Sequence, residues 1–312
     1  MPDIPVWPVC NINCVFCSNP PEYRRTARHY TFDVFKKKWE MYLKGKASYH
    51  KFNRVDDYIG LTGGEPTLHP EFLKILALLR KSWPDRKIKL LTNARLLRYP
   101  DFTKKVLFIG GRHLEIGVPV FGYDARTYQA ISRTPGAFED AQAGFANIMA
   151  FRLPGQLVGV RIILHKIILR WLKELLDYLY CHYPGIDTME LIYTEFEGAA
   201  AANFDVLKVK MTEVGKCLSQ LRSSLSRFRE FRLLHFPLCA VPQELWPNVW
   251  NTLDTLKIVH APSCRHCAAL EHCVGIHRTY ADKMGTGEFK PVKTLENFIF
   301  SDFRYHPVLG RK

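Results

Sequence analysis

Nine residues near the amino terminus decide how this sequence is interpreted: Val9-Cys10-Asn11-Ile12-Asn13-Cys14-Val15-Phe16-Cys17. They place three thiols at C-x3-C-x2-C spacing, directly after a run that predicts a strand. Three thiolates on one tight loop can hold three irons of a cubane and leave the fourth iron without a protein ligand. A reactive metal centre requires such an open position. Zinc, or a chance grouping of three cysteines, is the alternative interpretation.

Outward from this loop, short β-rich runs alternate with amphipathic helical patterns, which indicates βα units around a parallel sheet. The helical patterns place apolar residues at i, i+3, i+4 and i+7 in 72–79, and at similar helical spacing in 168–179. Six strands are too few for a closed eight-stranded barrel, so we expect an α/β fold with a partial (β/α)6 TIM-like barrel. The predicted strands are residues 4–9, 58–62, 87–92, 114–120, 157–164 and 189–193.

Two further regions have patterns of their own. In residues 32–42 the aromatic side chains have helical spacing, and we expect them to pack against the sheet. After a further helix at 212–225, residues 235–280 are rich in Pro, Cys and His, which predicts a small module organised by metal. We therefore expect a barrel core over residues 1–230 and a small cysteine-rich module with a tail over 231–312. The last thirty or so residues show no clear element.

The composition fits a folded domain that binds metal. With 312 residues and 47% hydrophobic residues, the chain can bury a substantial core. It shows no apolar run that could span a bilayer and no signal-peptide layout, so we expect a cytoplasmic location and no membrane partner. Seven of the nine cysteines fall in two local groups, which favours metal binding over disulfides. Cys181 and Cys217 are isolated in helical patterns and are interpreted as ordinary thiols.

The formal charge of +14 is strongly positive. A surface of this sign could attract nucleic acid, an acidic peptide or an acidic electron donor. No block of Lys and Arg stands out, so a solvated basic surface without a partner is the plain alternative.

The first cysteine group, with the aromatic Phe16 before its last cysteine, resembles the signature of the radical S-adenosylmethionine (SAM) superfamily. A second stretch, Leu61-Thr62-Gly63-Gly64-Glu65-Pro66-Thr67, resembles the GGEP segment of that family. The resemblance implies a 4Fe-4S cluster that cleaves SAM, and a GGEP segment that contacts the SAM amino group. The implied catalytic ligands are Cys10, Cys14 and Cys17, and the implied cofactor-binding residues are Phe16, Gly63, Gly64, Glu65, Asn93 and Arg161.

Two of these residues are carried over from their places on strands. Asn93 stands where the family often has Thr-Asn-Gly at the end of the third strand, and Arg161 matches an arginine that pairs with the SAM carboxylate. An outward-facing strand charge is the other interpretation of Arg161. The sequence departs from the family at residues 117–120, where Gly-Val-Pro-Val supplies no polar group for the SAM ribose.

A second cysteine group lies towards the carboxyl end. It comprises Cys239, Cys264, Cys267 and Cys273, and on spacing alone zinc fits four thiolates as well as iron does. The stretch resembles the auxiliary-cluster module of the SPASM and twitch subgroup, which implies one auxiliary 4Fe-4S cluster. The nearby histidines, His266, His272 and His277, are left out of the ligand set.

Residues 121–138, 236–239 and 244–247 most resemble peptide-modifying members of the family, including a maturase of His-Xaa-Ser peptide systems. This resemblance implies a radical SAM oxidoreductase that takes hydrogen from a peptide, with flavodoxin or ferredoxin as low-potential electron donor. Modification of tRNA or of a small metabolite is one alternative, and a non-enzymatic iron-sulfur or zinc scaffold is another. Four residues near strand ends could serve as acid, base or hydrogen donor, although surface or core roles are favoured: Tyr123, Tyr193, Glu195 and Glu197.

Overall fold

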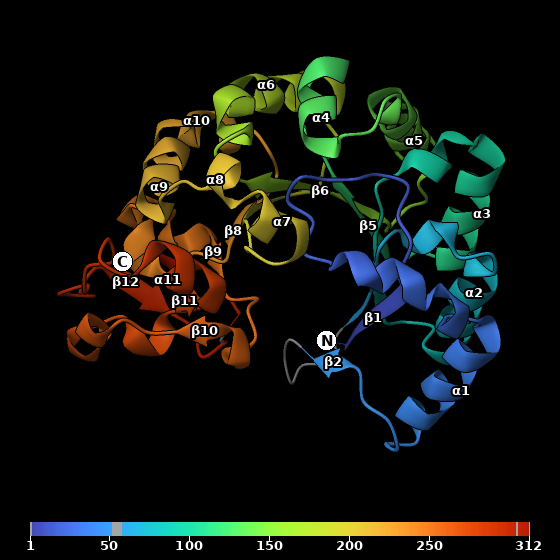
Figure 1. Cartoon of the computed structure of the whole chain (residues 1–312), viewed down its shortest axis with the longest axis horizontal. Coiled ribbons are helices and arrows are strands. Elements are labelled where there is room, and N and C mark those ends of the chain that lie inside the picture. The colour runs from blue at the N-terminus through green and yellow to red at the C-terminus, as the bar shows by residue number, and fades with distance from the viewer. Residues whose placement is uncertain (1, 52–57, 304, 312) are drawn as a thin grey trace.

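The computed structural model describes residues 2–51, 58–303 and 305–311, and its main feature is one curved, open sheet of nine strands (Figure 1). The strands are β1 (Pro2–Trp7), β2 (His50–Lys51), β3 (Tyr58–Gly63), β4 (Lys87–Leu91), β5 (Leu114–Pro119), β6 (Leu157–Leu164), β7 (Thr188–Tyr193), β8 (Phe231–Leu234) and β9 (Val249–Trp250). Their order is β2-β1-β3-β4-β5-β6-β7-β8-β9. Every neighbouring pair from β1 to β9 is parallel, and β2 pairs antiparallel with β1.

Helices cover the outer face of this sheet (Figure 1). In α2 the residues predicted from the helical period, Phe72, Ile75, Leu76 and Leu79, are the buried ones. The same alternation of strand and helix repeats around the sheet, as expected of a partial barrel. The covering helices are α1 (Phe32–Leu43), α2 (Phe72–Ser82), α3 (Pro100–Gly110), α4 (Ala125–Ser132), α5 (Ala137–Phe151), α6 (Leu172–His182), α9 (Met211–Gln220) and α10 (Arg222–Leu225).

The predicted α/β fold with a partial TIM-like barrel is confirmed, and all six predicted strands are present. The sheet has two more parallel strands than we predicted, because β8 and β9 continue it. At four and two residues, these strands are too short to show a period in the sequence. The domain boundary that we expected after residue 230 stays a prediction. The sheet itself continues beyond residue 230.

The aromatic residues of α1 contact the end of the next helix. Phe35 and Trp39 are buried, and the indole N–H of Trp39 donates to Ser82 Oγ at 3.0 Å. The ring of Trp39 also meets that of Trp83 edge-on, with centroids 4.9 Å apart. The stripe therefore anchors α1 to the end of α2 and not only to the sheet.

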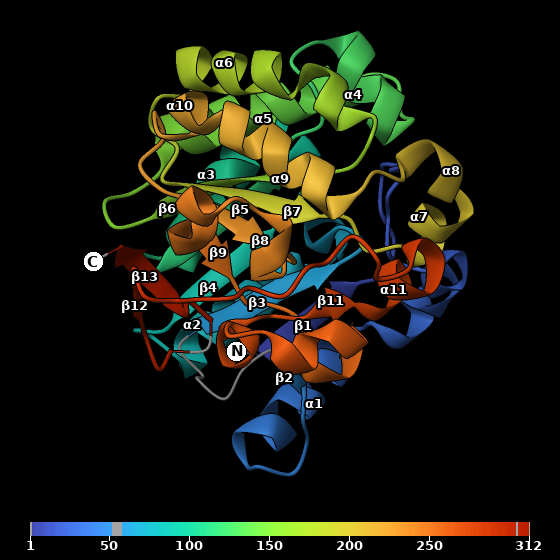
Figure 2. The same cartoon turned by 90° about the vertical axis from the view of Figure 1, so that its left-hand side faces the viewer.

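The carboxyl-terminal segment packs beside β8 and β9, as Figure 2 shows. Its elements are β10 (Ile258–Val259), β11 (Ile276–His277), α11 (Arg278–Met284), β12 (Phe298–Phe300) and β13 (Val308–Arg311). The hairpin of β12 and β13 gives order to a tail in which we predicted none, with Phe298 against Trp246 at 4.6 Å between centroids. Among the described residues, no helix has both the length and the apolar character needed to cross a membrane.

Candidate active site

The carboxyl ends of the parallel strands open onto one cavity of about 300 Å³. In such folds, sites gather at this end of the strands. The structure brings together every residue that we predicted around the first cysteine group. The cavity is lined by Cys10, Cys14, Phe16, Cys17, Gly63, Gly64, Glu65, Asn93 and Arg161.

The cysteine loop is held in shape by hydrogen bonds to distant parts of the chain. The N–H groups of Asn13 and Val15 donate to the carbonyls of Ser132 and Ile131, each at 3.0 Å. Ala199 N–H, in α7 (Gly198–Ala202), donates to Cys17 O at 2.8 Å.

The three thiols of this loop are free of disulfides and share one wall of the cavity. Burial raises the pKa of the Cys10 thiol to about 11, and burial likewise raises the pKa of Cys14. Three thiolates in this place therefore need a compensating cation, as a bound metal provides.

Gly63 and Gly64 are required by the close approach of the β1 chain. A Cβ on Gly64 would lie 2.5 Å from Val9 O, and one on Gly63, where φ is +132°, would lie 2.4 Å from Trp7 O. Gly64 N–H also donates to Trp7 O at 2.6 Å. We expected these glycines to let a ligand approach the backbone, and the structure shows that they first let two segments of this chain meet.

Glu65 is buried, and both of its carboxylate oxygens are used within the protein. Oε1 accepts from the Thr67 N–H at 3.1 Å, from its hydroxyl at 2.6 Å and from the Thr92 hydroxyl at 2.6 Å. Oε2 accepts from the Asn93 N–H at 2.7 Å. The carboxylate therefore ties the end of β3 to the end of β4.

Asn93 lies against the first cysteine. Its amide nitrogen donates to Asn11 Oδ1 at 2.7 Å and lies 3.7 Å from Cys10 Sγ. Its side-chain oxygen accepts from the Arg95 N–H at 3.0 Å. These bonds fix the amide group, so that its N–H groups face the sulfur.

Arg161 points into the cavity above a buried row of charges. Its Nε lies 3.4 Å from Glu190 Oε2, and Lys89 Nζ is 2.5 Å from the other oxygen of Glu190. Lys89 also contacts Glu115 Oε1 at 2.9 Å. Glu190 thus holds the guanidinium at Nε, and Arg161 lines the cavity.

Phe16 and Phe121 give the cavity an apolar wall. Their rings meet edge-on with centroids 5.4 Å apart, and Phe16 also lies 5.5 Å from the ring of the buried His165. Together with Pro119 at the end of β5, they line the side where the sequence lacks a polar partner for the SAM ribose.

Beyond these residues, the cavity has a polar wall formed by Glu195 and His235, which follow β7 and β8. His235 Nδ1 lies 3.2 Å from Tyr193 O and 3.6 Å from Glu195 Oε1. A carbonyl oxygen only accepts, so Nδ1 carries the proton and Nε2 keeps its lone pair. His235 also has a φ of +70°, a strained value for a non-glycine residue.

We predicted Glu195 near this site from the sequence, but not His235. Of the other residues we named near strand ends, Tyr193 donates its hydroxyl to Val209 O at 2.5 Å, which indicates a core role. Tyr123 lines a different pocket, together with Trp171.

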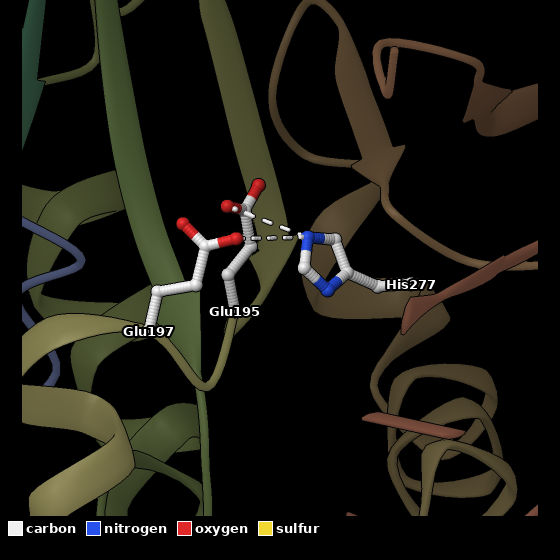
Figure 3. A group of neighbouring side chains, drawn as sticks. All are labelled: Glu195, Glu197 and His277. Atoms are coloured by element: carbon white, nitrogen blue, oxygen red, sulfur yellow. Dashed lines mark ion pairs between the residues drawn. The ribbon is translucent and has the colours of Figure 1, made fainter. Parts of the chain in front are cut away.

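Behind this wall, Glu195 and Glu197 meet residues of the carboxyl-terminal segment (Figure 3). Lys257 Nζ lies 3.0 Å from Glu195 Oε2 and 3.3 Å from Glu197 Oε2. His277 Nε2 lies 3.6 Å from Glu195 and 3.7 Å from Glu197. Burial opposes ionisation of Glu195, but its interaction with His277 and the charge of Lys257 hold the pKa of its carboxyl well below the usual range.

Glu195, Glu197 and His277 have the residue types of a metal site, but their hydrogen bonds argue against one. The Thr279 N–H donates to His277 Nδ1 at 3.2 Å. Nδ1 is therefore unprotonated, the ring proton is on Nε2, and Nε2 has no lone pair for a metal. Lys257 already supplies a cation to both carboxylates, so the group is a closed ion-pair network that joins the barrel to the carboxyl-terminal segment.

The second cysteine group also converges. All four thiols line a small apolar pocket in the carboxyl-terminal segment. Burial, followed by the neighbouring thiols, raises the pKa of Cys239 to about 12. The Val292 N–H lies 3.3 Å from Cys267 Sγ and the Gly275 N–H 3.5 Å from Cys273 Sγ, so both donate towards sulfur.

Comparison with known families identifies the class of protein. Residues 4–179 match the model of the Radical SAM superfamily, which is more than half of the chain. The chain therefore belongs to the radical SAM superfamily, a class of enzymes whose cofactors are a 4Fe-4S cluster and SAM. No curated protein sequence matches it.

Solved structures share the fold at low sequence identity. SuiB from Streptococcus suis bound to S-adenosylmethionine has a TM-score of 0.61 at 15% identity, over 93% of this chain and 75% of that one. SuiB bound to precursor peptide SuiA has a TM-score of 0.55 at 16% identity, over 74% of this chain and 48% of that one. Native anSMEcpe with bound AdoMet and Kp18Cys peptide has a TM-score of 0.52 at 16% identity, over 74% and 62%. This chain thus spans about half the length of SuiB in its peptide complex.

The residues of the cavity fit the family's cofactors. Three free thiols share one wall with no disulfide partner, as cluster ligands require. The Arg161 side chain, which also lines the cavity, has the guanidinium group that suits a carboxylate.

Proposed function

We propose that this chain uses SAM radical chemistry to modify a peptide. The observation that carries the proposal is the convergence of three free thiols, the Gly63-Gly64 turn and Arg161 on one cavity at the carboxyl end of the barrel. With the cluster and SAM bound, the site would supply a 5'-deoxyadenosyl radical that removes a hydrogen atom from a carbon of the substrate.

The chain's own residues would hold and shield these groups. Cys10, Cys14 and Cys17 hold the cluster, and Asn93 directs its amide towards Cys10. Arg161 binds the SAM carboxylate, while Glu190 keeps its guanidinium in place. The turn of Gly63, Gly64 and Glu65, which lines the same cavity, would receive the SAM amino group.

The rings of Phe16 and Phe121 would shield the radical from other hydrogen-atom donors, so that it meets only its target.

Cleavage of SAM without any substrate tests the class of reaction. With dithionite and SAM, the wild-type protein should release 5'-deoxyadenosine, and Cys14→Ala should release none because the loop can no longer hold the cluster. Cys181→Ala is the matched control, because Cys181 is exposed and outside both cysteine groups. Undiminished cleavage by Cys14→Ala would contradict the proposal.

We further propose an auxiliary 4Fe-4S cluster at Cys239, Cys264, Cys267 and Cys273. Its support is the pocket that the four thiols share and the resemblance of this stretch of sequence to the auxiliary-cluster module of the SPASM and twitch subgroup. Zinc is the rival metal, because four thiolates also satisfy a tetrahedral zinc ion.

A peptide substrate is supported by two relatives of the same fold, whose structures contain a precursor peptide and a Kp18Cys peptide. The charge of +14 favours the rival substrate, tRNA. Transfer of deuterium from a labelled short peptide into 5'-deoxyadenosine, with binding that changes little with salt, is the expected result. Transfer from labelled tRNA, with log affinity falling by about 0.7 to 0.9 per contacted phosphate for each tenfold rise in salt, would overturn this assignment.

A further inference from the structure

The first cysteine loop reaches the molecular surface at Asn13. Asn13 is exposed, whereas Ile12 and Cys14 on either side of it are buried. Cys14 is one of the three thiols that line the cavity. The surface at Asn13 therefore lies one residue from a proposed cluster ligand.

Exposed arginines flank this point from two elements. Arg24, in the 3-10 helix η1 (Pro21–His29), donates to Ile12 O at 3.3 Å. Arg133, at the end of α4, donates to Asn203 Oδ1 at 2.9 Å, and the Asn203 amide donates to Val15 O at 2.9 Å. Arg24 directly, and Arg133 through Asn203, are thus tied by hydrogen bonds to the backbone of the cysteine loop.

The helix η1 extends this positive surface. Its sequence PEYRRTARH adds Arg25 and Arg28, both exposed, and its acidic residue is Glu22. At a rise of about 2.0 Å per residue, Arg28 lies about 8 Å along the helix from Arg24. None of the residues of η1 is buried, so core packing does not explain its composition. We call Arg24, Arg25, Arg28 and Arg133 the arginine surface.

We propose that the arginine surface is the docking site of an acidic one-electron carrier protein that reduces the first cluster, an inference that rests on the proposed function. One electron leaves the carrier, which is oxidised, and enters the cluster, which is reduced, and no bond forms or breaks. A positive surface suits an acidic partner, raises its association rate and orients it. The position of this surface, around the point where a cluster-bearing loop meets solvent, favours an electron carrier over a nucleic acid.

Binding of a purified acidic flavodoxin to the full chain, with and without metal, tests the docking. Arg25→Glu combined with Arg28→Glu reverses half of the arginine surface without touching the cysteine loop. The matched control is Lys81→Glu with Lys105→Glu, which makes the same change in net charge at exposed positions on α2 and α3. At low salt the arginine variant should bind flavodoxin at least tenfold more weakly, and the control within twofold of wild type. The difference in flavodoxin affinity between the arginine variant and the wild type should disappear as added salt shortens the Debye length from about 10 Å at 0.1 M to about 3 Å at 1 M.

The rate of cluster reduction separates docking from chemistry. Reduction by photoreduced flavodoxin should slow by the same factor in the arginine variant, while reduction by a viologen radical should stay unchanged. Equal weakening in the lysine control, an unchanged flavodoxin rate, or arginine-dependent binding of tRNA instead of flavodoxin would overturn the proposal. If viologen and SAM gave no 5'-deoxyadenosine with wild-type protein, the proposed function would fail, whatever the flavodoxin binding showed.

Discussion

A single buried carboxylate, Glu65, joins two strand ends, and its replacement should be costly. Glu65→Gln keeps the size of the side chain but turns one acceptor into a donor that faces N–H or O–H groups. Leaving buried donors unpaired costs about 1 to 3 kcal/mol. We expect the free energy of unfolding of the metal-free protein to fall by about 2 kcal/mol, measured by urea denaturation. Glu71→Gln, at a partly exposed position where an ion pair with Lys74 is lost, should change it by much less.

His235 should make the fold sensitive to mild acid. Burial lowers its pKa to about 4, against the pull of Glu195, while His277 and Arg161 also face it. Since an unfolded histidine binds its proton near pH 6.5, the unfolded state binds more protons between pH 6.5 and 4. The stability contributed by neutral His235 is therefore complete above pH 6.5 and is lost as the pH falls towards 4.

Replacing this histidine should flatten the pH profile. Asparagine tolerates the positive φ of this position, so His235→Asn should fold, and its loss of stability between pH 7 and pH 5 should be smaller by about 2 kcal/mol. The measurement compares the urea midpoints of the wild type and of His235→Asn at the two pH values. Titration of other groups, such as Asp3, affects both proteins and cancels in the comparison. The exposed His29→Asn is the control variant, and an unchanged slope in His235→Asn would contradict the lowered pKa of this histidine.

The cysteine loop and the Gly63-Gly64-Glu65 turn could be predicted from the sequence, because each motif lies within a few consecutive residues. His235 and Lys257 carry no such signal. A lone histidine after a short strand and a lysine in a loop reach the cavity or its wall only because β7, β8 and the carboxyl-terminal segment fold together. The hydrogen bonds of Glu65 were equally hidden, since they depend on the parallel register of β3 and β4.

At the scale of elements, the crossing of β1 with the turn after β3 leaves no room for a side chain at Gly64. Gly64→Ala would place a methyl group 2.5 Å from Val9 O, against backbone that cannot easily shift. We expect a loss of stability of about 1 to 3 kcal/mol and less iron per chain after reconstitution, because the displaced segment carries Cys10. Gly287→Ala is the control, since a Cβ there meets no atom within 4 Å. Equal iron content in both variants would contradict this account.

Strands and helices with a clear period were predictable, and short ones were not. The six predicted strands each have five to eight residues, whereas β9 has only two. α11 is stabilised by tertiary contacts, including the Tyr280 hydroxyl near Met211 N and packing against Tyr193, rather than by an apolar stripe of its own.

At the scale of the whole molecule, two cysteine groups lie in different parts of the structure, which makes metal content a direct test of both. Anaerobically reconstituted protein should carry about eight irons and little zinc. The triple variant with Cys10, Cys14 and Cys17 changed to alanine should retain about four, since the second group does not depend on the first loop. Metal analysis together with the electronic spectrum gives the result. Zinc in the variant would refute the auxiliary iron-sulfur cluster and leave the SAM site untouched.

The hydrogen bonds of the cysteine loop also determine how late in translation the loop can take its final shape. Residues 10–17 leave the ribosome early, yet their shape depends on Ile131, Ser132, Ala199 and Asn203, which are synthesised much later. A nascent chain that ends before residue 199 carries three thiols but lacks the frame that aligns them. Delivery of iron and sulfide must therefore wait until most of translation is complete, and a stalled chain would expose reactive thiols to oxidation.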